Sequence, residues 1–138
     1  MKKKIAILGS TGSIGRSILN IISRDNGNFN VLLLTADSNY KKLFQQAKIF
    51  KVKNLIITNK ESFKKASKKK EAKRLNIYNS FKDLEKILNN KKLDYLMSSI
   101  SGIEGLKPTL STIHLTKRIA IANKEAIICG WNLINKTY

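Results

Sequence analysis

Residues 5–15 read Ile-Ala-Ile-Leu-Gly-Ser-Thr-Gly-Ser-Ile-Gly, a short apolar run followed by three glycines spaced as G-x-x-G-x-x-G. An uninterrupted apolar run of this length is typical of a strand buried on both faces of a parallel sheet. In the turn that follows, Gly9 permits a tight bend, Gly12 lets a diphosphate approach the backbone, and Gly15 lets helix and strand pack closely. The sequence therefore predicts a dinucleotide site at the first strand–helix turn.

The same turn offers hydrogen-bond donors to phosphate oxygens. The free N–H groups and the positive dipole end of the following helix would face the phosphates, and Ser10, Thr11 and Ser13 add hydroxyl groups. A P-loop is excluded, because Arg16 follows Gly15 where a P-loop needs Lys and then Ser or Thr. A tight strand–helix turn without a ligand is the alternative interpretation.

Apolar runs alternate with amphipathic segments along the rest of the chain, and no repeat or linker interrupts them. The expected strands are residues 4–8, 31–36, 55–58, 75–78, 94–98 and 119–122. The expected helices are residues 12–24, 39–51, 81–88, 108–116 and 125–134, with a solvated helix and loop at 60–74. Such βαβ units predict an α/β fold: a Rossmann-like, doubly wound, mostly parallel sheet with helices on both faces.

Apolar spacing also predicts which side chains pack inward. The first helix is expected to bury Ile14, Ile18, Ile21 and Ile22. His114 is expected in the core or at its boundary, and Cys129 and Trp131 are expected to pack against the rest of the domain. In the loop at residues 98–105, Ser101 and Glu104 match a capping box, whereas Pro108 is the stronger signal for a helix start.

The end of the second strand is where a Rossmann domain selects the ribose. Asp37 lies 22 residues after Gly15, close to the spacing of an acid that binds a free 2′-hydroxyl. Such an acid favours NAD, because a carboxylate repels the 2′-phosphate of NADP. The alternative is that Asp37 caps the second helix, with Asn39 as a competing cap. Position alone does not choose between these two interpretations.

A second polar group, Asn123-Lys124-Glu125, directly follows the last apolar strand. Loops at the carboxyl ends of parallel strands form the ligand crevice of such folds. Lys124 is placed to hold an anionic substrate group, and Asn123 to bond a carboxamide or ribose. The alternatives are a surface Lys124 and a Glu125 that only complements the helix dipole.

The net charge of +18 points to an anionic partner, and a basic nucleic-acid-binding module is one function that it suggests. The charge comes from 23 Lys and only 4 Arg, although Arg is the usual reader of base edges. Lys, Ile and Asn, all encoded by AT-rich codons, make up 56 of the 138 residues. We therefore interpret the charge as mainly compositional drift at exposed positions.

Several classes of protein are excluded by composition. One Cys and one His exclude a disulfide framework and a Cys/His zinc cluster. The longest apolar runs are far too short to span a bilayer. A start at Met1 with lysines and no apolar leader, together with the single Cys, predicts a cytoplasmic protein with no membrane partner.

Three segments taken together resemble the 1-deoxy-D-xylulose 5-phosphate reductoisomerase family: residues 5–15, 102–110 and 120–125. The spacing between them also fits, so the resemblance covers the whole chain. It implies an enzyme that rearranges the sugar phosphate and then reduces the resulting aldehyde with NADPH. The product is 2-C-methyl-D-erythritol 4-phosphate, in the non-mevalonate isoprenoid pathway. A divalent metal, Mn, Mg or Co, holds the substrate oxygens.

The resemblance also implies roles for individual residues. The cofactor diphosphate would contact Thr11, Gly12, Ser13 and Ile14. Residues Asp37, Ser38 and Asn39 would lie near the adenosine ribose. Asn123 and Glu125 would contact cofactor, and Lys124 the sugar-phosphate substrate. Asp37 and Ser38 stand where the family often carries Gly and a basic or small residue, so a strong clamp on the 2′-phosphate is not expected.

By the same resemblance, residues 1–138 are the N-terminal dinucleotide-binding domain of a longer protein. The metal-binding catalytic part and the C-terminal domain would lie outside this chain, and the full-length protein would be a homodimer. The 138 residues alone are then expected to bind NADPH weakly or not at all and to be inactive. Another Rossmann oxidoreductase that uses NADH is an alternative function, suggested by Asp37.

Overall fold

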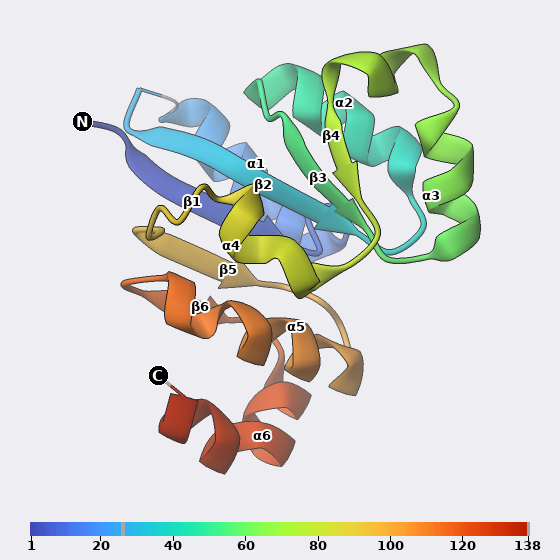
Figure 1. Ribbon diagram of the computed structural model, residues 1–138. Coiled ribbons are helices and arrows are strands. Elements are labelled where there is room, and N and C mark those ends of the chain that lie inside the picture. The colour runs from blue at the N-terminus through green and yellow to red at the C-terminus, as the bar shows by residue number, and fades with distance from the viewer. Residues whose placement is uncertain (26, 138) are drawn as a thin grey trace.

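The computed structural model describes residues 1–25 and 27–137, and at residue 83 the backbone alone. Six strands form one sheet: β1 (Lys3–Leu8), β2 (Phe29–Ala36), β3 (Asn54–Ile57), β4 (Asn76–Tyr78), β5 (Tyr95–Ser98) and β6 (Ile119–Ile121). All neighbouring strands are parallel, in the order β4-β3-β2-β1-β5-β6 (Figure 1). The predicted Rossmann-like, doubly wound sheet is confirmed, and the chain reverses its direction of progress between β1 and β5.

The helices are α1 (Ser13–Arg24), α2 (Tyr40–Phe50), α3 (Lys60–Ser67), α4 (Leu84–Ile87), α5 (Leu106–Thr112) and α6 (Lys124–Thr137). Short 3-10 segments lie at Lys70–Arg74, Phe81–Asp83, Ile103–Gly105 and Ile113–Leu115. Successive side chains of a strand point to opposite faces of the sheet, so β1 contributes residues to two hydrophobic cores, one on each face. Ile5 and Ile7 pack with α1, α2 and α3 on one face, whereas Ala6 and Leu8 pack with α4 on the other. The sheet is therefore covered on both faces.

The face that α1 buries differs from the predicted one. Gly15, Leu19 and Ile22 are buried, whereas Ile14 and Ile21 are 44% and 66% exposed. The spacing of the buried residues, i, i+4 and i+7, is still that of a helix face. The face is turned because Gly15 must lie against the backbone of the preceding turn, and this contact fixes the rotation of the helix.

The start of α5 also differs from the prediction. A 3-10 turn begins at Ile103, and Pro108 is the third residue of α5, not its first. Gly102, with a φ of 73°, precedes the turn, and no side chain caps it, so the predicted capping box from Ser101 is wrong. Proline is tolerated here because the first turn of a helix leaves its N–H groups without helical partners.

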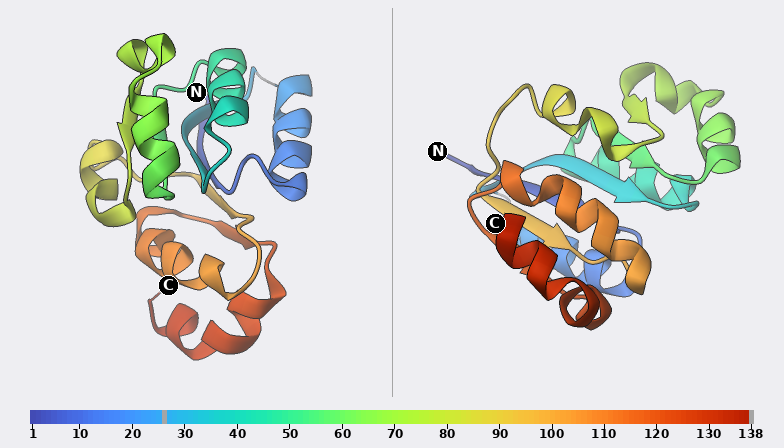
Figure 2. Two further views of the ribbon diagram at one scale, coloured as in Figure 1. Left: turned by 90° about the vertical axis from the view of Figure 1, so that its right-hand side faces the viewer. Right: turned by 60° about the horizontal axis from the view of Figure 1, so that its bottom comes forward.

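Helix α6 lies beside α5 at the β6 edge of the sheet (Figure 2). Gly130 allows this approach, since a Cβ there would lie 3.1 Å from Leu106 Cδ2. The outer face of α6 leaves Ile128 76% and Trp131 56% exposed, and Cys129 is exposed too, so the prediction that Cys129 and Trp131 pack inward is wrong. No helix in the described part of the chain is both long and apolar enough to cross a bilayer.

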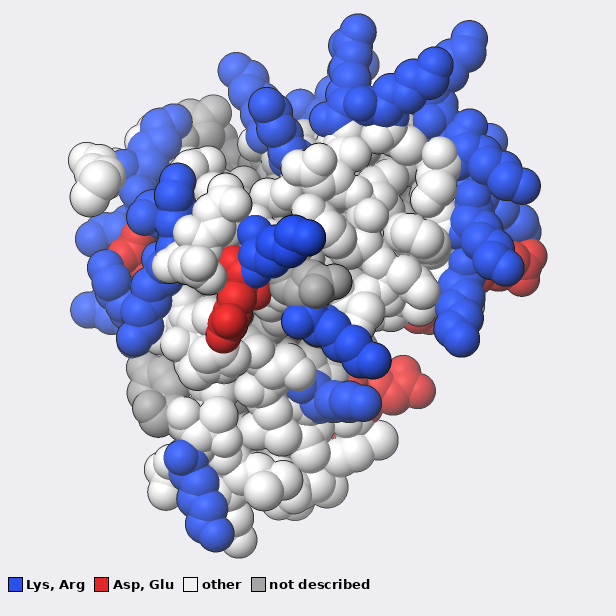
Figure 3. All heavy atoms as spheres, viewed as in Figure 1, with Lys and Arg blue, Asp and Glu red and all other residues white. Residues whose placement is uncertain are grey.

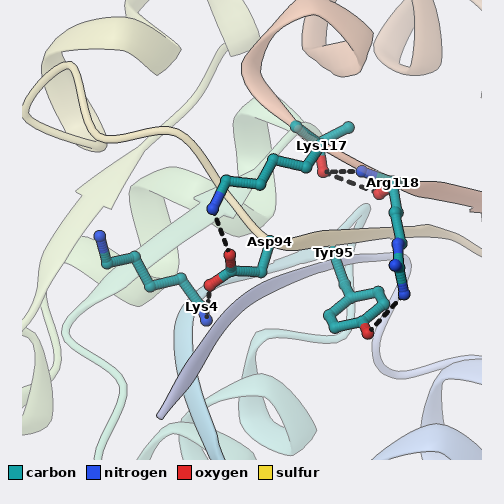
Figure 4. A network of polar contacts seen from close by, with 6 residues as sticks. Lys4, Asp94, Tyr95, Lys117 and Arg118 are labelled. Carbon is teal, nitrogen blue, oxygen red and sulfur yellow. Dashed lines mark hydrogen bonds and ion pairs between the residues drawn. The ribbon is translucent and has the colours of Figure 1, made fainter. Parts of the chain in front are cut away.

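A polar network joins the amino ends of three strands (Figure 4). Asp94, just before β5, accepts hydrogen bonds of 2.8 Å from the Lys4 amide of β1 and from the Lys117 ammonium that precedes β6. Next to it, the Arg118 guanidinium donates to the Tyr95 hydroxyl and lies 5.7 Å from the ring centroid. These contacts fix the relative register of β1, β5 and β6 at this end of the sheet.

The Asp94 carboxylate should make the stability of the fold depend on pH. Its hydrogen bonds from the Lys117 ammonium and the Lys4 amide lower its pKa from 3.8 to about 2. The stabilisation is therefore present above pH 4 and is lost as the pH falls toward 2. We expect Asp94→Asn to lower the thermal midpoint at pH 6 and to flatten its decline between pH 4 and 2. Exposed Glu71→Gln is the control, and an unchanged pH profile in Asp94→Asn would contradict the assignment.

Candidate functional site

The turn between β1 and α1 depends on glycine at its first position. Gly9 has a φ of 76°, in the left-handed region that favours glycine. A Cβ there would also lie 3.0 Å from the backbone of Ser99 and Ile100, which directly follow the neighbouring strand β5. The Gly9 amide donates to Thr35 Oγ1 over 3.0 Å, which ties the turn to β2 as well. The turn is thus held between the carboxyl ends of β2 and β5.

The other two glycines play different parts. A Cβ at Gly15 would lie 2.6 Å from Ser10 Cα, so Gly15 is required for packing, as predicted. At Gly12 the nearest atom to an added Cβ is the Gly9 oxygen at 3.6 Å, an ordinary contact. Gly12 is exposed and sits at the N-cap of α1 with no side-chain cap. Packing does not demand glycine there, and its absent side chain leaves bare backbone at the helix N-terminus.

The hydroxyl groups of the turn do not all face the same way. Ser10 is fully buried, and its hydroxyl donates to Gln46 Oε1 over 2.8 Å. The Gln46 amide in turn donates to the Ser10 oxygen over 2.9 Å, so Ser10 fastens the turn to α2 from behind. Thr11 lines the cleft in front of the turn, whereas Ser13 and Ile14 are exposed at the start of α1. In this conformation the Ser10 hydroxyl offers no donor to that cleft.

The cleft has a volume of about 780 Å³, within the usual range for small-molecule sites. It opens at the carboxyl ends of the strands, where the order reverses between β1 and β5, which is where open α/β sheets bind ligands. Its polar lining includes Gly9, Thr11, Gly12, Thr35, Asp37, Thr58, Asn79, Ser80, Ser99 and Ser101. Its apolar lining includes Phe81, Leu84, Ile100, Ile103, Pro108 and Leu115.

The interpretation of Asp37 as the cap of the second helix is wrong. Asn39 is the N-cap of α2, because its side chain accepts a hydrogen bond from the Lys42 amide over 3.2 Å. Asp37 instead lines the cleft and accepts a 2.8 Å hydrogen bond from Thr58 Oγ1 at the end of β3. Ser38, between them, is exposed. The carboxylate is therefore part of the cleft wall.

Asn123 is buried and makes its hydrogen bonds within the protein. Its Nδ2 donates to the Ile100 oxygen over 2.6 Å and to the Gly102 oxygen, and its Oδ1 accepts from the Ala126 amide over 3.2 Å. The side chain thus caps α6 and ties it to the loop after β5. Gly105 makes room for it, since a Cβ there would lie 2.8 Å from Asn123 Nδ2.

Lys124 and Glu125 begin α6 and have exposed side chains. Neither belongs to the lining of the cleft in front of the glycine-rich turn. Both follow β6, the strand beyond β5, so they lie further along the same edge of the sheet. Asn123, Lys124 and Glu125 therefore lie at the carboxyl ends of the strands, as the cleft does, but after β6, which is two strands away from β1.

Among the residues of the cleft wall that the sequence does not single out as site residues are Thr58, Asn79 and His114. Thr58 and Asn79 each follow an apolar strand directly, and Asn79 Nδ2 donates to the Ile57 oxygen over 2.7 Å. The rule that singles out Asp37, a polar residue just after a predicted strand, also applies to Asn79, whereas Thr58 is missed because the predicted strand 55–58 includes it. His114, expected in the core or at its boundary, is exposed on the cleft wall with its Nε2 3.2 Å from Glu85 Oε1. The helical spacing at 108–116 failed there because the chain turns into a 3-10 segment at Ile113.

The residues described do not fit a metal site. Among the side chains that the structure describes, those of residues 1–25, 27–82 and 84–137, no group of three or more His, Cys, Asp or Glu could hold a metal ion. The divalent metal that the resemblance implies is therefore assigned to no residue of this chain, and no chemical step is derived through it.

Comparison with known proteins gives consistent matches. The family model for 1-deoxy-D-xylulose 5-phosphate reductoisomerase matches residues 5–130. The enzyme of that name from Pelagibacter ubique is 57% identical over 135 residues, and the one from Thermotoga maritima is 32% identical over 135 residues. These matches cover 97% and 98% of this chain but 35% and 34% of the relatives, so the chain spans about a third of their length.

Solved structures agree with these matches. The reductoisomerase from Zymomonas mobilis in complex with NADPH aligns with a TM-score of 0.87 and 29% identity, over 99% of this chain and 36% of its own. A reductoisomerase in complex with NADPH, fosmidomycin and magnesium aligns with a TM-score of 0.85 and 31% identity, over 98% of this chain and 33% of its own.

Gly15→Ala should destabilise the fold although alanine is the better helix former. The added methyl group would press on the backbone of Ser10, which cannot move aside, so we expect the free energy of unfolding to fall by about 3 kcal/mol or more. Gly27→Ala is the matched control, because a Cβ there meets nothing within 4 Å. Urea unfolding followed by circular dichroism measures both, and an equal effect of the two changes would contradict the packing role.

Asn123→Ala should also destabilise the fold, because buried groups of Ile100 and Ala126 lose their partner. We expect a loss of about 2–4 kcal/mol in the free energy of unfolding. Asn123→Asp keeps the acceptor for the Ala126 amide but turns a carboxylate toward two carbonyl oxygens, so it should cost at least as much. Exposed Asn132→Ala on the same helix is the control. An Asn123→Asp variant as stable as the original would show that the amide is oriented differently.

Proposed function

Because the chain belongs to the 1-deoxy-D-xylulose 5-phosphate reductoisomerase family, we propose that it forms the NADPH-binding part of that enzyme. The proposed reaction of the whole protein converts 1-deoxy-D-xylulose 5-phosphate to 2-C-methyl-D-erythritol 4-phosphate in the non-mevalonate isoprenoid pathway. The observation that carries the proposal is the cleft in front of an exposed Gly12, at the point where the strand order reverses. Homologous structures that contain NADPH support the choice of cofactor.

The fit of the dinucleotide follows from what each part of the cleft offers. Gly12 leaves bare backbone at the N-terminus of α1, where the helix dipole and the N–H groups of Thr11, Ser13 and Ile14 are offered to a diphosphate, and the Gly12 N–H itself donates to the Gly9 oxygen over 3.3 Å. Gly9 and Gly15 hold that backbone in place. The adenosine ribose lies at Asp37, Ser38 and Asn39 in this proposal. When bound, NADPH supplies the hydride for the reduction.

The second polar group contributes at the far end of the same edge. In the proposal Asn123 shapes the loop that the cofactor passes, Glu125 contacts the cofactor, and the exposed ammonium of Lys124 binds the sugar phosphate. A lysine is suited to this part because it presents a flexible point charge to a phosphate or hydroxyl oxygen. The divalent metal, Mn, Mg or Co, belongs to the whole enzyme in this proposal and not to these residues.

The basic surface is proposed to be solvated and to bind no nucleic acid. Figure 3 shows Lys and Arg side chains projecting outward over much of the visible face, with few acidic side chains between them. Many of the lysines lie between the start of α3 and the end of the 3-10 segment after it, at Lys60, Lys64, Lys65, Lys68, Lys69, Lys70 and Lys73. Phe63, the aromatic side chain within this segment, packs against the core, so it is not free to stack on bases between the lysines. DNA affinity that persists near physiological salt would instead favour a nucleic-acid-binding module.

We further propose that the whole protein acts as a homodimer in the cytoplasm and has no membrane partner. Support for the compartment comes from Cys129, the single cysteine of the sequence, which is a free thiol. Reduced thiols are typical of the cytosol. Support for the dimer comes from the family alone.

The test of the proposed function is dinucleotide binding at the turn. Because the 138 residues alone are expected to bind NADPH weakly or not at all, the test uses the whole protein, in which we expect NADPH to shift the backbone amide NMR signals of residues 9–15. Gly12→Ala should weaken this binding by about tenfold or more, since its methyl group stands where a diphosphate approaches the backbone. The same change should alter the free energy of unfolding by less than about 1 kcal/mol. Gly27→Ala is the control, and NADPH shifts confined to other residues would contradict the proposed site.

A further inference from the structure

Two lysines, Lys82 and Lys107, are among the residues that line the cleft. Lys82 lies in the 3-10 segment Phe81–Asp83 after β4, and Lys107 lies in α5, which follows β5. Both side chains are exposed. Among the side chains that the structure describes, neither lysine forms an ion pair. Their ammonium groups can therefore bind an anionic part of a ligand in the cleft.

The strand order places the two lysines on different sides of the glycine-rich turn. In the order β4-β3-β2-β1-β5-β6, the proposed ribose end of the site lies at the end of β2, and Lys82 follows β4 on that same side. Lys107 follows β5, on the other side of β1. Neighbouring strands lie about 4.8 Å apart, so the ends of β2 and β4 are separated by roughly 10 Å. A phosphate that stands out from the ribose and the long stem of a lysine can together span that distance.

Hydrogen bonds between successive strand ends fix the backbone at Lys82 relative to Asp37. Thr58 Oγ1, directly after β3, donates to Asp37 Oδ1 over 2.8 Å. Asn79 Nδ2 donates to the Thr58 oxygen over 3.1 Å, and Ser80 Oγ accepts from the Lys82 amide over 3.2 Å. The backbone from the end of β2 to the 3-10 segment is thus joined strand by strand, and the flexible stem of the lysine carries its charge from this fixed point.

The segment after β2 supplies no positive charge to a 2′-phosphate. A phosphate monoester carries a charge of about −1.5 to −2 at pH 7, and a basic side chain near the ribose is the usual means by which a Rossmann domain accommodates it. Here the three residues after β2 are Asp37, Ser38 and Asn39, none of which is basic. A cation from another strand end is therefore needed to offset the repulsion between the phosphate and the Asp37 carboxylate.

The basic side chains that follow this segment in sequence lie outside the cleft lining. Lys41 and Lys42 are in the first turn of α2. Lys42 lines a separate groove between α1 and α2 together with Arg16, and Lys41 lines neither the groove nor the cleft. Of the lysines and arginines that the structure describes, Lys82 is thus the one that lines the cleft on the ribose side.

The acidic residues of the cleft also distinguish the two lysines. Glu104 stands three residues before Lys107 and lines the cleft with it, and side chains at this spacing are neighbours on a helical turn. Glu85 stands three residues after Lys82, but its Oε1 lies 3.2 Å from His114 Nε2 on the other wall. The contact with His114 leaves the charge of Lys82 less compensated by its neighbouring acid than that of Lys107.

We propose that Lys82 binds the 2′-phosphate of NADPH and gives this protein its preference for NADPH over NADH. The proposal rests on the proposed function, since it needs a dinucleotide in the cleft. Lys82 supplies, from the end of β4, the positive charge that residues 37–39 lack. Its ammonium donates charge-assisted hydrogen bonds to the phosphate oxygens and offsets their repulsion by Asp37.

The test measures the dissociation constants of NADPH and NADH for the whole protein by isothermal titration calorimetry. Lys82→Met keeps most of the stem and removes the charge. We expect it to weaken NADPH binding by about tenfold and to leave NADH binding within about twofold of the original. Lys82→Arg, which retains a cation, should keep NADPH binding within about threefold. Lys86→Met, on α4 and outside the cleft lining, is the matched control.

Ionic strength gives a second readout that loss of structure alone would not produce. Salt screens the attraction between an exposed ammonium and a phosphate. In the original protein, raising the salt concentration should therefore bring the dissociation constants of NADPH and NADH closer together, because the diphosphate is common to both cofactors. In Lys82→Met the preference for NADPH should not decline in this way.

Three results would contradict the inference. A ratio of the two dissociation constants that is unchanged in Lys82→Met would overturn it alone. A changed ratio in Lys107→Met or Lys42→Met, without one in Lys82→Met, would assign the 2′-phosphate to another cation and would also overturn it. Binding of neither cofactor by the original whole protein would overturn the proposed function and this inference together.

Discussion

The close approach of Gly15 to the backbone of Ser10 is the contact on which most of the site depends. Two backbone segments can meet this closely only where no Cβ stands between them. The contact fixes the rotation of α1, and therefore which of its side chains enter the core. It also fixes where the first N–H groups of the helix lie relative to the end of β1. Packing and ligand binding thus share a single steric requirement.

The cleft has two walls, which are held by different means. On the β2 side, buried hydrogen bonds among Ser10, Thr35 and Gln46 fasten the turn to its neighbours. On the β5 side, Asn123 joins the loop after β5 to the start of α6. Both walls therefore depend on neutral side chains with their hydrogen-bonding atoms engaged inside the protein. Buried neutral networks of this kind hold a shape at little electrostatic cost.

The sequence was sufficient for the order of elements and for the glycine-rich turn, because both depend on local patterns. Continuous apolar runs mark buried strands, and all six occur where the pattern predicts them. Helical periodicity defines a face only to within about one residue, so it misplaces the buried face of α1, which the Gly15 contact determines. The buried hydrogen bonds of the Ser10 and Asn123 side chains are also not predicted by the sequence. Their partners, Gln46 and Ile100, are distant in sequence, and residue type does not reveal them.

The position of Trp131 has a practical consequence. It is the single tryptophan of the sequence, and it lies 56% exposed on the outer face of α6, outside the cleft lining. An indole in water fluoresces at longer wavelengths than one in an apolar contact. The chain therefore carries an intrinsic optical reporter of whatever covers α6. That reporter is separate in space from the glycine-rich turn, so burial of α6 and occupation of the cleft are distinguishable in one sample.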